Sequence, residues 1–193
     1  MGVREYTSFP DALKAPEKVR RIYVLVHSAR TVLPDFRLFP NLEDLTIHGP
    51  MAHVTKFPQI FACTKLRSLT FTGSSVARIP PGFAKLQRLE EIALVGNRKL
   101  AALPDDIVEL PRLRRLAIDS NALAKLPARI GRLGRLVELV AYNNRLRELP
   151  PSLSKLAKLR WLELQCNRLA KPPAALMKLR LRHLMTDFPS IDR

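Results

Sequence analysis

Cysteine is scarce in this sequence of 193 residues. The two cysteines, Cys63 and Cys166, lie far apart and form no CxxC motif. A disulfide-framed secreted domain needs several paired cysteines, and a zinc module needs paired ligands, so neither class is expected. A reducing compartment is the simpler interpretation, and the sequence therefore predicts a cytoplasmic protein.

Long hydrophobic runs are also missing. No apolar stretch approaches the roughly 18–20 residues that a bilayer crossing needs. The N-terminus lacks the apolar core of a signal peptide, since it reads MGVREYTSFPDALK. We therefore expect no membrane span and no export by a signal peptide. Delivery into another cell as an effector stays open as an alternative.

Acidic side chains are few. Lys and Arg number 33 against 17 Asp and Glu, which gives a formal net charge of +16. Such an excess is typical of proteins that bind nucleic acid or anionic membranes. The hydrophobic fraction of 47% excludes a disordered tail, and the length suffices for a domain with its own core. The position of the charges must decide whether they mark a site.

An internal repeat runs through the chain. Four segments match LxxLxLxxN, with Ile or Ala allowed at the apolar positions: LEEIALVGN, LRRLAIDSN, LVELVAYNN and LRWLELQCN. Weaker copies begin at Val19, Leu42, Leu66 and Leu181, and the copies follow one another at intervals of 22–24 residues. Leu-Pro pairs and apolar residues three apart recur in the second half of the units, as in LPARIGRL. A constant period of this length predicts a stacked repeat architecture.

These motifs resemble the leucine-rich repeat family over residues 19–193. The LPxxIxxL half is similar to the intracellular, Ras-suppressor-like subclass that is also common in bacteria. The resemblance implies an α/β fold, a right-handed solenoid or horseshoe of about eight units with a parallel sheet on its concave side. The alternating leucines need neighbouring units to bury them, which supports stacking independently. We predict that residues 1–18 form an N-terminal capping segment with a short helix capped by Ser8, and that the protein is a monomer.

Catalytic motifs are not recognisable. The sequence contains no nucleotide-binding glycine loop, no hydrolase or metalloprotease signature and no acidic metal cluster. His48 near Glu43 and Asp44 could imitate a general base with an orienting carboxylate, but solvent-facing strand residues are the simpler interpretation. We therefore expect no catalytic residue, no cofactor and no metal, and we predict that the protein is not an enzyme.

The residues predicted to face outward from the strands carry nearly balanced charge. They include seven arginines and eight carboxylates, so this wall is close to −1 and the other surfaces hold the excess. The signs alternate between neighbouring units, as at Arg21, Asp44 and Arg67. Two interpretations stay open: a lattice of exposed ion pairs, and a mixed-charge template for a protein partner.

Aromatic side chains are few, and the single tryptophan, Trp161, falls on the predicted concave wall. Exposed Trp and Tyr beside Arg are typical of interface hot spots, which favours binding of a protein partner here. Alternatively, the last unit folds over Trp161 as a C-terminal cap. The candidate partner-binding residues are Arg114, Arg115, Glu138, Val140, Tyr142, Arg160, Trp161, Glu163, His183 and Met185.

A basic position precedes most of the strand motifs. It would form a ridge about 35 Å long at one edge of the sheet, since neighbouring strands lie about 4.8 Å apart. Its candidate anion-binding residues are Lys65, Arg88, Arg112, Arg135, Lys158 and Arg180. The simpler interpretation is a set of solvated positions that maintain solubility. We predict a non-enzymatic protein-protein interaction module that binds its partner on the concave face. The alternative is a basic edge that binds nucleic acid or anionic surfaces.

Overall fold

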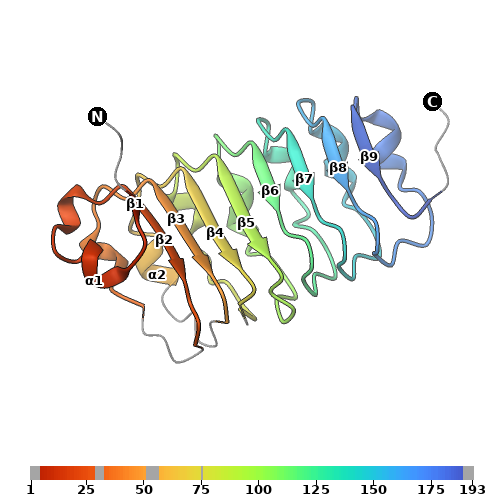
Figure 1. The fold of residues 1–193 in the computed structure, drawn as a ribbon. Helices are drawn as coiled ribbons and strands as arrows, with labels where there is room; N and C mark the ends of the chain where they lie inside the picture. Colours follow the sequence, from red (N-terminus) through yellow and green to blue (C-terminus); the bar gives the residue numbers. More distant parts are fainter. Residues whose placement is uncertain (1–4, 29–32, 51–56, 75, 189–193) are drawn as a thin grey trace.

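A row of parallel strands forms one long face of the protein (Figure 1). The computed structural model describes residues 5–28, 33–50, 57–74 and 76–188. Within them, each strand pairs in parallel with the next along the chain, in the order β1 to β9. The strands are β1 (Glu5–Tyr6), β2 (Arg21–Leu25), β3 (Asp44–His48), β4 (Ser68–Thr72), β5 (Glu91–Val95), β6 (Arg115–Ala117), β7 (Glu138–Val140), β8 (Trp161–Glu163) and β9 (His183–Met185). The predicted repeat solenoid is confirmed.

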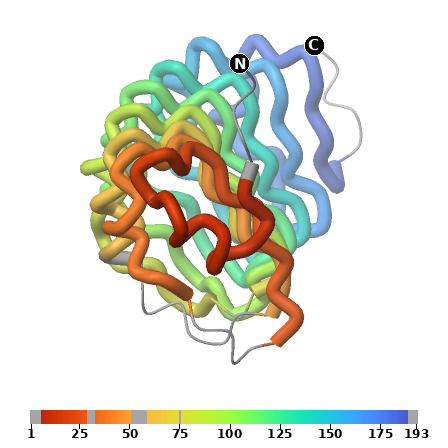
Figure 2. The backbone as a smooth tube through the Cα atoms, turned by 60° about the vertical axis from the view of Figure 1, so that its left-hand side comes forward, coloured from red at the N-terminus to blue at the C-terminus, as the bar shows by residue number. Residues whose placement is uncertain are grey.

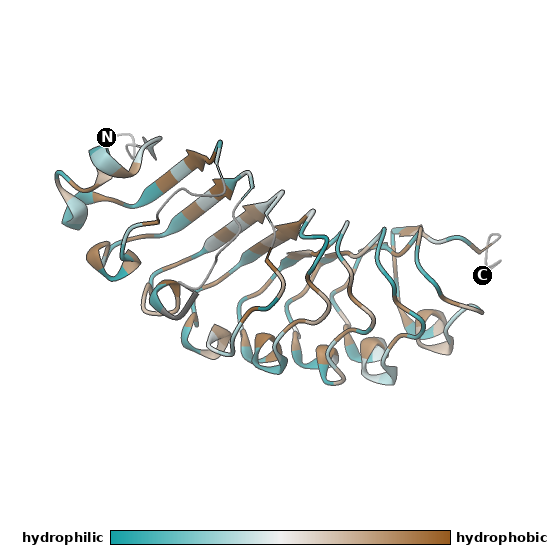
Figure 3. Cartoon of the chain, turned by 90° about the horizontal axis from the view of Figure 1, so that it is seen from below, coloured by the Kyte–Doolittle hydropathy of each residue, from teal (hydrophilic) through white to brown (hydrophobic). Residues whose placement is uncertain are grey.

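Short helices line the opposite long face, as the view from below shows (Figure 3). Apolar residues three apart, such as Leu153 and Leu156, bury one side of a single turn. The α-helices are α1 (Phe9–Ala12) and α2 (Phe57–Ile60). The 3₁₀ helices are η1 (Pro16–Lys18), η2 (Phe36–Leu38), η3 (Phe83–Lys85), η4 (Asp105–Glu109), η5 (Ile130–Arg132), η6 (Pro151–Lys155) and η7 (Ala174–Lys178).

The core lies between the two faces. Inward residues of each strand are buried and alternate with more exposed ones, as in β3, where Leu45 and Ile47 are fully covered. Among the described residues, one cluster of buried apolar side chains extends from Tyr6 to Leu179. Each such side chain contributes about 1.5–3 kcal/mol relative to an exposed one, so the stacked leucines supply the main driving force for folding.

Buried asparagines hold the turns that follow the strands. The Asn144 side chain accepts from the Leu123 amide (3.0 Å) and donates to the carbonyls of Ile118 (2.9 Å) and Ala141 (3.2 Å). Asn121 and Asn167 repeat this arrangement in their own units. Asn97 donates to the carbonyls of Phe71 and Val95 in the same way, but its Oδ1 accepts from the Ser74 hydroxyl. Each amide therefore donates to carbonyls of its own unit and of the preceding one.

The last of these turns uses a different residue. Both Asp187 carboxylate oxygens accept backbone amides, one from Cys166 (2.9 Å) and one from Asn167 (3.2 Å). Asp187 is one of the eight carboxylates counted on the outward wall, but it follows β9, which ends at Met185, and it stabilises this turn. Pro189, which stands at the Asn position of this unit, lies outside the described residues.

The residue just before the Asn position of the motif, which Pro50 and Ser74 occupy in two units, adopts the left-handed backbone region. Its φ is positive in six successive units, at Gly49, Gly73, Gly96, Ser120, Asn143 and Cys166. At Gly49 a Cβ atom would stand 1.9 Å from the carbonyl oxygen of Val26, so only glycine fits there. Val26 itself is buried, because the alternation of exposed and buried side chains along β2 continues past Leu25.

The N-terminal segment lies across one end of the stack (Figure 2). It adds β1 to the edge of the sheet, a strand that the sequence did not predict. The predicted helix is present as α1, and the Ser8 hydroxyl accepts from the Asp11 amide. Phe9 packs edge-on against Phe36, with ring centroids 6.1 Å apart. Across the described part of the chain, no helix is long and apolar enough to cross a membrane.

Candidate functional site

Ion pairs link neighbouring units on the outward face of the sheet, which we call the strand face. Arg20 pairs with Glu43 (2.6 Å) and Arg21 pairs with Asp44 (2.9 Å). The remaining arginine-carboxylate pairs on this face are Arg67 with Glu90 (3.0 Å) and Arg115 with Glu138 (3.3 Å). The predicted alternation of signs is thus a lattice in which each pair contributes about 0.2–1 kcal/mol.

His48 does not use the neighbouring carboxylates. Its ring lies 5.2 Å from the Tyr23 ring, and Nδ1 is hydrogen-bonded to Thr72 Oγ1. Glu43 and Asp44 are held by arginines instead. The structure therefore does not assemble the base and orienting carboxylate that the sequence spacing suggested.

A groove of about 610 Å³ opens on the strand face over β4 to β8. Ala93 and Ala117 stand opposite each other in the register of β5 and β6, and their small side chains leave space between larger neighbours. The groove is lined by Thr70, Glu91, Ile92, Ala93, Val95, Arg115, Ala117, Asp119, Glu138, Val140, Tyr142, Trp161 and Glu163. This hollow is our candidate functional site.

The charge of the groove is opposite to that of the whole chain. Its lining contains four carboxylates, from Glu91, Asp119, Glu138 and Glu163, and one guanidinium, from Arg115. The remaining arginines of the strand face, such as Arg114 and Arg160, do not line it. The groove therefore has a formal charge of −3 within a protein of +16.

Asp119 is the most sheltered of these carboxylates, with 5% of its surface exposed. Burial raises its pKa, while a hydrogen bond from the Tyr142 hydroxyl acts in the opposite direction and the negative charge of Glu163 adds to the rise. The pKa of Tyr142 is raised in turn, mainly by the charge of Asp119. Asp119, Tyr142 and Glu163 therefore interact electrostatically inside the groove.

Trp161 remains accessible, with 41% of its surface exposed. Its ring is stacked on the His183 ring at a centroid distance of 3.6 Å, and its Nε1 donates to Glu163 Oε1 (2.7 Å). His183 Nε2 lies 3.4 Å from the same carboxylate oxygen. The last unit thus packs on Trp161 without burying it, which differs from the capping alternative.

The structure brings together part of the predicted partner-binding set. Arg115, Glu138, Val140, Tyr142, Trp161 and Glu163 line the groove. His183 and Met185 lie beyond it on β9, and Arg114 is exposed outside it. The Arg160 guanidinium donates to the carbonyls of Ala157 (3.0 Å) and Leu159 (2.8 Å) rather than pointing into the groove.

Seven residues of the groove lining were not among the predicted partner-binding residues. They are Thr70, Glu91, Ile92, Ala93, Val95, Ala117 and Asp119. Only the pairing register, in which Ala93 stands opposite Ala117, shows where the hollow forms. Val140 lines the groove but is almost buried, with 9% of its surface exposed.

The predicted basic ridge is exposed. Five of its residues make no ion pair among the described residues: Arg88, Arg112, Arg135, Lys158 and Arg180. The sixth, Lys65, donates a hydrogen bond to Asn41 Oδ1 (2.5 Å). A second row of cations ends the nearby 3₁₀ helices, at Lys85, Arg132, Lys155 and Lys178. In η4 this place is held by Glu109, which pairs with Arg132 of the next unit (2.7 Å).

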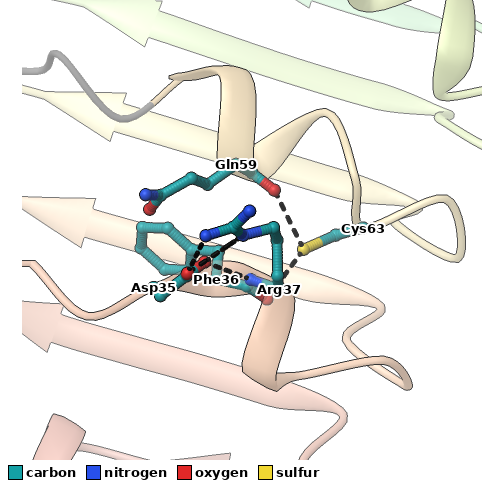
Figure 4. A network of polar contacts seen from close by, with 5 residues as sticks. All are labelled: Asp35, Phe36, Arg37, Gln59 and Cys63. Atoms are coloured by element: carbon teal, nitrogen blue, oxygen red, sulfur yellow. Dashed lines mark hydrogen bonds and ion pairs between the residues drawn. The ribbon is translucent and has the colours of Figure 1, made fainter.

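Cys63 belongs to a packed polar network near the N-terminal end (Figure 4). Its thiol donates to the carbonyls of Phe36 (3.3 Å) and Gln59 (3.9 Å), and Arg37 binds the Asp35 carboxylate. Burial, with a smaller effect of Asp35, raises the pKa of Cys63 to about 12. Cys166 is exposed. Among the residues that the structure describes, no group of three or more His, Cys, Asp or Glu could hold a metal ion.

Comparison with known proteins places these observations in a family. A model of the leucine-rich repeat region matches residues 18–180. A solved leucine-rich repeat protein of Leptospira interrogans is 27% identical with a TM-score of 0.87, and the alignment covers 98% of this chain and 49% of that one. The repeat domain of the type III effector XopL is 24% identical with a TM-score of 0.75, covering 91% and 63%.

A more distant likeness shows the fold alone. An internalin from Listeria monocytogenes is 15% identical with a TM-score of 0.59, covering 98% of this chain and 60% of that one. The chain spans about half the length of the Leptospira protein. No curated protein sequence matches it significantly. The repeated motifs, the single parallel sheet and the match over residues 18–180 together show that the chain belongs to the leucine-rich repeat family.

Proposed function

We propose that this protein is a non-enzymatic interaction module that binds a protein partner in the groove over β4 to β8. Leucine-rich repeat domains typically act as interaction scaffolds. The observation that carries the proposal is the groove of about 610 Å³, in which exposed Trp161 lies beside Tyr142 and several charged side chains. Aromatic anchors surrounded by polar groups are typical of interface hot spots.

His183 and Met185 would contact the partner at the rim of the groove, because both lie on β9 next to β8. Arg114 and Arg160 are proposed as outer contacts. We further propose that the protein acts as a monomer in the cytoplasm and that residues 1–18 cap the repeats. The pairing of β1 with β2 and the packing of Phe9 on Phe36 support that capping role.

Site-specific photo-crosslinking tests the proposed face. A photoreactive phenylalanine replaces Trp161 or Tyr142, and the matched control replaces Met177, which is 63% exposed on η7 at the opposite face. We expect protein adducts from the groove positions in cells that produce the protein, and none from position 177. Adducts from position 177 alone would contradict the proposal.

Trp161→Ala separates a partner contact from a structural role. We expect capture of the crosslinked partner to be lost while the melting temperature changes little, because Trp161 is substantially exposed. If capture persists while the melting temperature falls, the capping interpretation replaces the binding interpretation.

A second candidate function rests on the row of exposed cations at the edge of the strands. Arg88, Arg112 and Arg135 are exposed, and no ion pair neutralises them within the described residues. Phosphate groups of nucleic acid or of anionic lipids would neutralise these charges and release counterions. Delivery into another cell as an effector would be compatible with either mode of binding.

Salt dependence tests this second candidate. For duplex DNA, log K should fall with log salt, and changing the three arginines Arg88, Arg112 and Arg135 to Gln should reduce the slope by about 3. Arg20→Gln serves as the control, because Arg20 is paired with Glu43. An unchanged slope in the triple variant would show that the ridge does not bind the polyanion.

A further inference from the structure

We propose that the groove receives a Lys- or Arg-bearing segment of a protein partner, whose cationic side chains meet the carboxylates of Glu91, Asp119 and Glu163. This inference rests on the proposed function and adds the chemistry of the partner. It does not follow from the composition of the chain, because a net charge of +16 would suggest an anionic ligand.

The ion-pair lattice of the strand face is incomplete in the groove. Glu43, Asp44 and Glu90 are each bound by an arginine of the preceding unit. In the groove the single guanidinium, Arg115, is bound to Glu138. Three carboxylates of the lining therefore lack a lysine or arginine partner within the described residues.

The immediate neighbours of these three carboxylates do not replace the missing cation. Asp119 accepts a hydrogen bond from the neutral Tyr142 hydroxyl. Glu163 accepts the neutral indole N–H of Trp161 and lies near His183. Glu91 is exposed. A lysine or arginine brought by a partner would complete the pattern that the rest of the face already follows.

Acidic groups in the groove repel one another. The negative charge of Glu163 raises the pKa of both Asp119 and Tyr142, so the two carboxylates interact unfavourably within one hollow. Asp119 is also largely removed from water, which weakens the screening of that repulsion. A cation between Asp119 and Glu163 would relieve this repulsion, whereas an anionic ligand would increase it.

The shape and polarity of the groove lining suit a long cationic side chain. Ala93, Ala117 and Val140 form an apolar floor, against which the methylene stems of Lys or Arg can pack. The exposed indole of Trp161 adds an aromatic surface that attracts a cation. The groove thus offers an apolar surface for the stem of a long cationic side chain and an aromatic surface for its charged end.

Peptide titration tests the proposal, and Trp161 supplies the signal because it is the only tryptophan. The probes are blocked hexalysine, hexaserine and hexaglutamate, at low salt. The groove variant combines Glu91→Gln with Asp119→Asn, which keeps an acceptor for Tyr142. The matched control combines Glu17→Gln with Glu148→Gln, two exposed glutamates that do not line the groove.

We expect hexalysine to change Trp161 fluorescence saturably, with a dissociation constant that rises at least 10-fold in the groove variant and stays unchanged in the control. The other surfaces repel a cationic peptide, so saturable binding reports on the groove. Circular dichroism and the melting temperature confirm that both variants remain folded.

Two results would overturn the inference. Tighter binding of hexaserine or hexaglutamate at Trp161 would show that the partner is not cationic, although the groove would still be a protein-binding site. Equal binding of hexalysine by the groove variant and the control would place the contact elsewhere. Crosslinking from positions 142 and 161 tests the proposed function separately, so the two ideas can fail independently.

Discussion

Single side chains in this protein differ sharply in their environments although their sequence positions look alike. The position before the Asn position of the motif is occupied by Gly in three units and by Ser120, Asn143 and Cys166 in the next three. All six adopt a positive φ, which costs a residue with a Cβ atom roughly 1 kcal/mol or more. Ser120, Asn143 and Cys166 therefore carry backbone strain that the letters of the repeat motif do not show.

The two cysteines are expected to react very differently. Cys63 is buried and its pKa is raised to about 12, so its thiol stays protonated at pH 8. Cys166 is exposed. Titration with a thiol reagent at pH 8 should modify one cysteine per folded chain within minutes, and both after unfolding. Rapid modification of two cysteines in the native state would contradict the burial of Cys63.

Asp119 should lower stability at neutral pH. Burial raises its pKa in the folded state, so its contribution to stability is full below the pKa of the unfolded chain and is lost as the pH rises through the folded value. Asp119→Asn mimics the protonated acid. We therefore expect this variant to melt at a higher temperature than the wild type at pH 7, with little difference near pH 3. A lower melting temperature of the variant at pH 7 would contradict a raised pKa of Asp119 in the folded state.

At the level of elements, each unit contributes a strand, a turn and a short helix, and the turn is the part that joins one unit to the next. The asparagine amides donate to carbonyls of their own and the preceding unit. A buried amide must find hydrogen-bond partners, and here the backbone of two neighbouring units supplies them. The use of Asp187 in the last turn was not predicted, because it lies outside the motif position.

Removing one of these amides should weaken the whole stack. Asn144→Ala leaves buried carbonyls and the Leu123 amide without their partner, and we expect a loss of about 2–3 kcal/mol in the free energy of unfolding. Gln87→Ala removes an amide with a single exposed hydrogen bond and should cost less than about 0.5 kcal/mol. Equal losses in urea unfolding would show that the buried amide has no special role.

The complete stack has two dissimilar ends. At the N-terminal end, Phe9 and Ala12 of the first segment and Val19 of the first unit are buried. At the other end, Leu181 and Leu184 are only partly buried. Because each unit contacts mainly its neighbours, stability is transmitted along the row and local opening begins where burial is weakest.

Hydrogen exchange should follow this gradient. Amides that pair β8 with β9 should exchange faster than those that pair β2 with β3, because the last leucines bury less surface. Phe9→Ala, which is expected to cost about 3–5 kcal/mol, should raise exchange first in β2 and β3. Uniform protection in the wild type, or an effect of Phe9→Ala confined to β9, would contradict the end-capping role of residues 1–18.

The sequence alone was sufficient for the architecture. The interval of 22–24 residues, the alternating leucines and the turn asparagines predicted the stacked parallel strands, because apolar periodicity is a local property of the chain. The alternation of Arg and acidic residues between units likewise predicted the ion pairs of the strand face.

The groove and its acidity required the folded structure. A hollow depends on which small residues stand opposite each other across strands, as Ala93 and Ala117 do, and this register is set by packing between units. The burial of Asp119 and the turning of Arg160 away from the groove depend on the same packing. Charge counted along the chain could not separate the paired carboxylates from those that still lack a cation, because pairing depends on distances in three dimensions.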